Sequence, residues 1–192
     1  MQKQNKTRLQ IVDALDGLLK QDSIEHIKVT QICQQVGISR TTFYSYFSDV
    51  FEVVTWMWDY VMEDALYAVG KTVNYSEGHT RSFYALLEHL EFFRNAFKSK
   101  AYYGAFEYGS RKVKEVLISN AEENLGRPFT REELLHIDFR SYGAAAITRQ
   151  WVIDGAIETP EEMSEIIRAG TPAFFFQLLS FGEEYKPKTW EL

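Results

Sequence analysis

The placement of proline is the feature that most constrains how this chain can fold. Prolines occur only at positions 128, 160, 172 and 187, so none interrupts the first 127 residues. Proline inside a helix removes a hydrogen bond and clashes with the preceding turn. Apolar residues in this stretch recur at the spacing of an amphipathic helix, as in Ile11, Leu15 and Leu18. Alternating strand patterns are absent, so the sequence predicts an all-α fold.

Glycine and proline clusters divide the rest of the chain into segments. Breaks are expected at 74–78, 126–128 and 155–159. They separate helical segments that we predict at 49–73, 80–98, 101–124, 130–154 and 160–181. Two of these segments have clear starts, because Thr130 and Thr159 each stand three residues before a glutamate, the pattern of a capping box.

The composition favours a cytoplasmic protein. The chain is 45% hydrophobic, which suffices for a core without disulfides or a structural metal, and its single cysteine, Cys33, excludes an intrachain disulfide. The opening residues MQKQNKTRLQ lack the apolar stretch of a signal peptide. No apolar run approaches the ~20 residues of a membrane helix. We therefore expect a cytoplasmic location and no membrane partner.

No pattern indicates catalysis or metal binding. The histidines at positions 26, 79, 89 and 136 form neither a helical pair nor a cluster with cysteine. Glycine-rich phosphate loops and nucleophile-elbow sequences are also missing. We expect no metal, no cofactor and no enzymatic activity.

The charge distribution restricts where nucleic acid could bind. The net charge is −6, and affinity for DNA depends largely on lysine and arginine. Residues 1–50 carry six Lys and Arg against five Asp and Glu, whereas residues 51–192 carry fifteen against twenty-two. A DNA-binding surface is therefore expected within the first fifty residues.

The segment VTQICQQVGISRTTFYSYF, at 29–47, fits two short helices joined by a tight turn. Cys33 is small enough for the place where the helices cross. Gly37 tolerates the positive φ of a turn, and Ser39 can cap the second helix. That helix is predicted to run from Arg40 to Phe47.

With Phe43 and Phe47 turned inward, the second helix displays a short polar face. A helix-turn-helix protein presents such a face to base edges in the major groove, and the hydroxyls beside it suit phosphate oxygens. An ordinary helical hairpin with half-buried tyrosines has the same spacing and remains the alternative. The exposed face comprises Arg40, Thr41, Thr42, Tyr44 and Ser45.

The sequence Ile-Ser-Arg-Thr-Thr-Phe-Tyr-Ser-Tyr-Phe, at 38–47, lies between an N-terminal amphipathic helix and a long helix. Over about residues 5–65 this arrangement resembles the tetracycline-repressor (TetR) family. The resemblance implies a three-helix helix-turn-helix domain at 5–65, including the start of a linking helix. A helical-bundle domain for regulation, ligand binding and dimerisation would then occupy 66–192. The implied function is a sequence-specific, ligand-responsive repressor that binds double-stranded operator DNA as a homodimer.

The resemblance also assigns roles to matching residues. Arg40, Thr41 and Thr42 would read bases. Two positions depart from the family pattern: Lys28 stands where a capping threonine is usual, and Val50 stands where a phosphate-contacting lysine is common. The phosphate contacts would come from Lys28, Thr30, Tyr44, Ser45 and Tyr46.

A second resemblance covers Arg140–Gly155 and the following Pro-Glu-Glu-Met. It is to a TetR subgroup that includes regulators of dihydroxyacetone metabolism. The last two long segments would pair in a dimer, with contacts from Ala145, Phe175 and Leu178. A pocket for an unknown, mostly apolar effector is predicted at Tyr102, Tyr103 and Phe106, because their run has no single buried face.

Signalling between the domains would pass through the aromatic segment at 56–60, which is expected to pack against both. A different class of function stays open. Val50, the acidic balance and the subgroup resemblance are also compatible with an adaptor that keeps the fold, does not bind DNA and acts by binding another regulatory protein.

Overall fold

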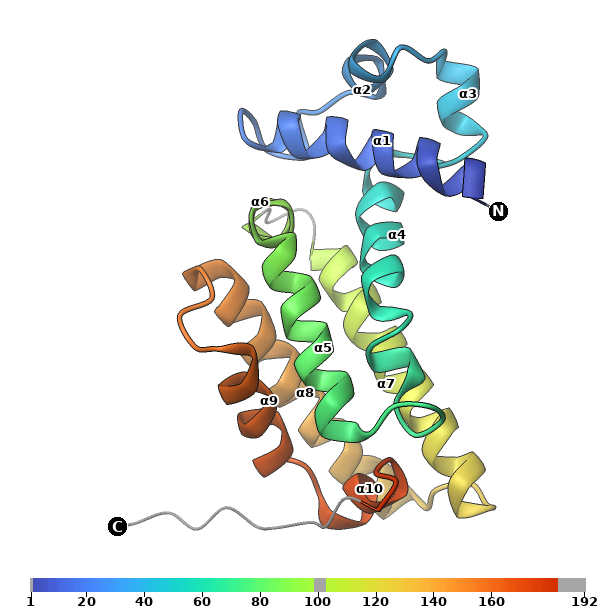
Figure 1. Ribbon diagram of the computed structural model, residues 1–192, viewed down its shortest axis with the longest axis vertical. Coiled ribbons are helices and arrows are strands. Elements are labelled where there is room, and N and C mark those ends of the chain that lie inside the picture. The colour runs from blue at the N-terminus through green and yellow to red at the C-terminus, as the bar shows by residue number, and fades with distance from the viewer. Residues whose placement is uncertain (1, 99–102, 183–192) are drawn as a thin grey trace. The chain divides into compact units, whose positions relative to one another are not determined.

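The computed structural model describes residues 2–98 and 103–182 (Figure 1). Within these residues all regular structure is helical, apart from an isolated bridge between Val69 and Val73. The predicted all-α class is therefore confirmed. The elements in chain order are α1 (Gln2–Leu19), α2 (Val29–Val36), α3 (Arg40–Tyr44), α4 (Val50–Met62), the 3-10 helix η1 (Leu66–Ala68), α5 (Tyr75–Glu88), α6 (Leu90–Lys98), α7 (Tyr103–Leu125), α8 (Arg131–Asp154), α9 (Pro160–Ala169) and α10 (Ala173–Leu178).

Two predicted segments are divided in the structure. The segment predicted at 49–73 contains α4, which ends at Met62, and η1, after which the chain turns at Gly70, whose φ of 80° lies in the left-handed region. The segment predicted at 160–181 divides into α9 and α10. The break falls at 170–172, because Pro172 cannot continue the preceding helix and instead starts the next one.

The break expected at 74–78 was wrong. Gly78 lies inside α5 and is buried, and a Cβ atom built on it would stand 2.1 Å from Cγ2 of Val69. This glycine therefore permits close packing and does not make a turn. The segment predicted at 80–98 is in turn two helices, α5 and α6, which separate at His89.

The described chain forms two compact units that interleave in sequence. One contains residues up to 60 together with 89–109, and the other contains 61–88 together with the chain from 110 onward. The sequence had suggested one division, between 65 and 66. A single cut cannot describe these units, because α6 and the first turns of α7 belong with the helix-turn-helix.

The first unit has a core of aromatic and branched side chains. Figure 1 shows α2 and α3 on the same side of α1, and Ile11, Leu15 and Ile32 are fully buried there. Trp58 of α4 packs against two rings of α6, with centroids 6.0 Å from Phe93 and 6.1 Å from Phe97. This packing explains why α6 belongs to the unit.

The second unit is built around α5, which runs alongside α9 (Figure 1). Phe83 of α5 meets Trp151 of α8, with ring centroids 5.2 Å apart. Asn120 and Asn124 of α7 donate to backbone carbonyls of Val69 and Gly70, both at 2.8 Å. These bonds hold the irregular chain between α4 and α5 against α7.

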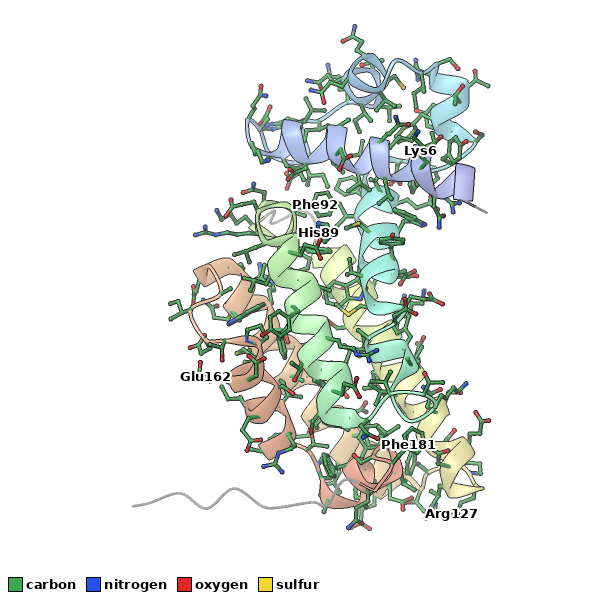
Figure 2. All side chains as sticks on the ribbon, in the orientation of Figure 1. Lys6, His89, Phe92, Arg127, Glu162 and Phe181 are labelled. Atoms are coloured by element: carbon green, nitrogen blue, oxygen red, sulfur yellow. The ribbon has the colours of Figure 1, made fainter. Side chains whose placement is uncertain are left out.

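Both predicted capping boxes are confirmed. Thr130 starts α8 and accepts from the N–H of Glu133, while Thr159 starts α9 and accepts from the N–H of Glu162. Arg127, labelled with Glu162 in Figure 2, pairs with Glu133 at 2.8 Å. The Arg127 hydrogen bonds and the bond from the Thr130 backbone lower the pKa of Glu133 to about 2.

Candidate nucleic-acid interface

The turn between α2 and α3 depends on the backbone of Gly37. Its φ is 74°, in the left-handed region, and nothing lies within 4 Å of a Cβ built there. The requirement is thus for backbone conformation and not for space. The N–H groups of Gly37 and Ile38 donate to the carbonyl of Cys33 at 2.9 and 3.0 Å, which closes α2. The predicted helix–turn–helix is confirmed.

The second helix starts as predicted but is shorter. Ser39 Oγ accepts from the N–H of Thr42 at 3.0 Å, so Ser39 is the N-cap. α3 ends at Tyr44 and not at Phe47. The hydroxyl of Ser45 donates to the carbonyl of Thr42 at 2.6 Å, and such local side-chain bonds compete with helix continuation.

The faces of α3 are arranged as the sequence predicted. Phe43 and Phe47 are buried, with ring centroids 6.0 Å apart. The ring of Phe47 also packs against Trp56, with centroids 5.9 Å apart. The opposite side consists of exposed polar residues. These are Arg40, Thr41, Tyr44 and Ser45.

Thr42 differs from the other two predicted base readers. It is half-buried, and its hydroxyl lies 2.8 Å from Oγ of Ser39. This bond belongs to the helix cap and restrains the hydroxyl, so Thr42 is less free to turn toward a base than its exposed neighbours. Arg40 and Thr41 are therefore the better placed residues.

Arg40 and Tyr44 contact each other across one helical turn. The guanidinium carbon of Arg40 lies 5.9 Å from the centre of the Tyr44 ring, a cation–π distance. The contact limits the rotamers of an otherwise free arginine before any partner arrives. Tyr46, the second predicted phosphate-contacting ring, is half-buried.

The start of α2 presents two further predicted phosphate contacts. Lys28 and Thr30 are both exposed there. Lysine cannot accept a hydrogen bond, so Lys28 leaves the N–H groups of the first turn without a side-chain cap. Gln31 supplies the other half of a capping box, because its Oε1 accepts from the backbone N–H of Lys28 at 2.7 Å. Val50, where the family often has a lysine, is buried in the core.

The aromatic segment at 56–60 was expected to pack against both domains. Trp56 stacks on Tyr60, with ring centroids 5.2 Å apart, and lies beneath the guanidinium of Arg8 at 5.6 Å. These partners belong to the unit that contains the helix-turn-helix, and they join α1 to α4. Packing of the segment against the other unit stays a prediction.

The predicted pocket cannot be placed. Tyr102 lies outside the described residues, and for Tyr103 and Phe106 only the backbone of α7 is described. The pocket remains a prediction.

The predicted dimer residues divide into two kinds. Ala145 on α8 and Leu178 on α10 are partly exposed. Phe175 is fully buried beside Phe129, with centroids 6.0 Å apart, so it cannot contribute surface to an interface. The sequence did not show this burial, because Phe174, Phe175 and Phe176 follow one another in α10 and their order does not reveal which ring faces inward.

α8 has an exposed apolar face that was not predicted from the sequence. Leu135, Phe139 and Tyr142 are 56%, 83% and 70% exposed. Their spacing of four and three residues places them on one side of the helix, and the exposed Gly143 and Ala146 follow on that side. The same periodicity that located buried faces could have found this one.

Among the described residues, no group of three His, Cys, Asp or Glu side chains is arranged to hold a metal ion. None of the described helices is both long and apolar enough to cross a membrane.

Comparison with solved structures places the fold. The chain resembles the dihydroxyacetone kinase operon activator DhaS with a TM-score of 0.59 and 20% identity, over 84% of this chain and 91% of that one. It also resembles the TetR family repressor AlkX from Dietzia sp. strain DQ12-45-1b, with a TM-score of 0.53 and 13% identity, over 90% and 98%. At these identities the likeness shows the fold alone.

Sequence comparison identifies the family. A curated relative, the uncharacterized HTH-type transcriptional regulator YxbF from Bacillus subtilis (strain 168), is 26% identical over 81% of this chain. The match spans 42% of the length of that relative. The TetR family model described as the transcriptional regulator C-terminal region matches residues 74–169, half of the chain. The chain therefore belongs to the TetR family of transcriptional regulators.

Proposed function

We propose that this protein is a homodimeric repressor that binds operator DNA through α3 and releases it when a small molecule binds. The observation that carries the proposal is the division of α3 into two faces. Phe43 and Phe47 anchor the helix in the core, while Arg40, Thr41 and Tyr44 remain exposed. An exposed helix of this kind, held by a rigid turn, suits the major groove.

The polar side chains of α3 match two kinds of contact. Arginine can bond bidentately to guanine, and the threonine methyl suits thymine. The hydroxyls of Tyr44 and Ser45, together with exposed Lys28, suit phosphates. We assign base reading to Arg40 and Thr41 and positioning to the other residues.

The homodimer is supported by the exposed face of α8. A helix that leaves Leu135, Phe139 and Tyr142 largely exposed presents a contiguous apolar surface that a partner would cover. A second copy is the occupant we propose, since a two-fold axis brings the same face of both copies together. Exposed Gly143 would let the two α8 helices approach closely. This face replaces Phe175 in the predicted interface.

The two solved structures of this fold differ in the sign of regulation that their names give, an activator for DhaS and a repressor for AlkX, so the choice of repression follows the resemblance to the TetR family. The second candidate is an adaptor that binds another regulatory protein in place of DNA. The burial of Val50 favours it, because a phosphate-contacting lysine is common at this position. Such a protein would keep α3 and lose its affinity for DNA.

Selection of bound duplexes from a random DNA pool tests the proposal. We expect enrichment of a near-palindrome with half-sites about one helical turn apart. Affinity should fall steeply with salt, with a log–log slope of about −0.9 for each phosphate neutralised. The double substitution Arg40→Ala, Thr41→Ala should abolish enrichment, while Arg111→Gln, a charge loss on α7, should not.

No enrichment at low salt, from a folded wild-type protein, would refute DNA binding. The adaptor would then be the remaining candidate.

A further inference from the structure

Four polar side chains are buried together in the unit formed by 61–88 and 110–182. Tyr75 and His79 come from α5, Arg140 from α8 and Thr171 from the turn between α9 and α10. All four are more than nine-tenths buried. Neither the helix-turn-helix nor the α8 face uses them.

The geometry fixes nearly every proton in this cluster. Nδ1 of His79 lies 2.8 Å from the carbonyl of Tyr75, which can only accept, so Nδ1 carries the proton. Nε2 of His79 therefore accepts from Nη2 of Arg140, at 2.7 Å. The hydroxyl of Thr171 donates to the carbonyl of Ile167 at 2.7 Å. Its oxygen is then the acceptor for the Tyr75 hydroxyl at 2.7 Å and for Nε of Arg140 at 3.2 Å. The Tyr75 oxygen accepts from Nη2 of Arg140.

The cluster thus holds a positive charge among neutral acceptors. Burial and the charge of Arg140 lower the pKa of His79 to about 3, so the imidazole is uncharged near neutral pH. Burial raises the pKa of the Tyr75 hydroxyl, which also stays neutral. Within the described chain no carboxylate pairs with Arg140, and the nearby Asp138 pairs with Lys114 at 2.8 Å. A buried cation without an anion is unfavourable, and an entering anion would relieve this.

The turn that carries Thr171 lies next to exposed surface. Gly170 beside it is exposed, and Pro172 on its other side lines an open surface hollow of about 450 Å³. His136, one helical turn before Arg140, lines the same hollow, as do Glu132 and Glu133. Glu133 is already paired with Arg127. An anion that entered beside Pro172 would take the place of Thr171 against Arg140.

We propose that Arg140 binds the anionic group, a carboxylate or a phosphate, of the small molecule that regulates this protein. The inference rests on the proposed function in assuming such an effector. It places the charged group of the effector in the unit formed by 61–88 and 110–182, and not at the pocket predicted from Tyr102, Tyr103 and Phe106. The anion would replace the neutral oxygens of Thr171 and Tyr75, because it adds the attraction of opposite charges and can bond the guanidinium through two oxygens at once.

Binding at this site would also change how the helices are joined. Arg140 now ties α8 to α5 and to the α9–α10 turn through Tyr75, His79 and Thr171. An anion on Arg140 would release these ties within α8, beside Phe139 and Tyr142. The effector could thereby alter the α8 pairing of the dimer.

Thermal unfolding of the full chain in different salts tests the site. The probes are sodium acetate and sodium phosphate, each titrated at constant ionic strength against sodium chloride. We expect the wild-type Tm to rise saturably with at least one probe. Arg140→Gln should lose this rise. Arg111→Gln, which removes the same charge from an exposed position, should keep it.

A second variant separates binding from a purely structural role. Thr171→Val removes an acceptor that competes with the anion, so half-saturation should occur at a lower probe concentration than in wild type, even if the protein without the probe is less stable. Arg140→Lys should retain a weaker response. The proposal is overturned if wild type responds equally to all salts, if Arg140→Gln responds like Arg111→Gln, or if Thr171→Val does not gain affinity. The unfolding experiment contains no DNA. Its result can therefore be interpreted even if the selection of operator duplexes fails.

Discussion

Arg40 and Tyr44 lie one helical turn apart on α3, and we expect them to make different kinds of DNA contact, which substitution of each residue tests. Arg40→Ala should weaken operator binding by ~1–3 kcal/mol and relax preference at one base position per half-site. Tyr44→Phe should weaken binding to all sequences alike, since a phosphate contact carries no base information. The phenylalanine keeps the ring under Arg40, so only the hydroxyl is lost.

Fluorescence anisotropy with the selected operator and single-base variants would measure both effects. An Arg40→Ala protein with unchanged base preference would show that this arginine is not a base reader. A loss at Tyr44 that depends on sequence would reverse the assignment of that residue.

The other residue with a sharp expectation is His79. Its pKa is about 3 in the folded protein and near the ordinary histidine value of 6.5 when unfolded, so the unfolded chain binds the extra proton. Stability contributed by the neutral imidazole is fully present above about pH 6.5 and is lost as pH falls toward 3. Each pH unit within this window changes the free energy of unfolding by about 1.4 kcal/mol, so acidification from pH 7 to 5 should cost about 2 kcal/mol.

Urea unfolding at pH 7 and pH 5 measures this loss. His79→Gln keeps an acceptor for Arg140 and cannot titrate. Between pH 7 and pH 5 its free energy of unfolding should therefore fall by about 2 kcal/mol less than that of wild type. An identical pH dependence in both proteins would show that His79 is not the group that takes up the proton.

At the scale of helices, the sequence predicted where helices start better than where helical segments divide. The starts of α3, α8 and α9 were found because each cap is a local pattern. A side-chain hydroxyl accepts a hydrogen bond from the backbone N–H three residues later. The break at His89 has no glycine or proline to mark it. Gly78 was taken for a turn because a packing glycine and a turn glycine look the same in one sequence.

In the candidate sites, too, features set by local sequence were predictable and features set by distant packing were not. The exposed residues of α3 were predictable, since two inward phenylalanines fix the opposite face. The sequence did not show that Phe175 is buried and Phe139 is exposed, because burial of each ring depends on packing between distant segments. The burial of Arg140 could not be predicted at all, since arginine usually lies at the surface and its three partners come from α5 and a turn far away in sequence.

For the molecule as a whole, DNA binding should depend on the α8 face. Phe139 is 83% exposed, so glutamate there costs little in the isolated protomer but places two charges together across a two-fold interface. Phe139→Glu should therefore be a folded monomer, measured by sedimentation velocity and circular dichroism. Ile157→Glu is the matched control, because Ile157 is 78% exposed but lies outside α8.

The monomer should also lose operator affinity, although Phe139 is not in the helix-turn-helix. A dimer binds its second half-site at high effective concentration, an advantage on the order of 10²–10⁴-fold. Phe139→Glu should lose an amount in this range on the full operator but bind a single half-site as wild type does. A monomer with undiminished affinity for the full operator would separate dimerisation from DNA binding, and a Phe139→Glu dimer would show that the two copies meet through another surface.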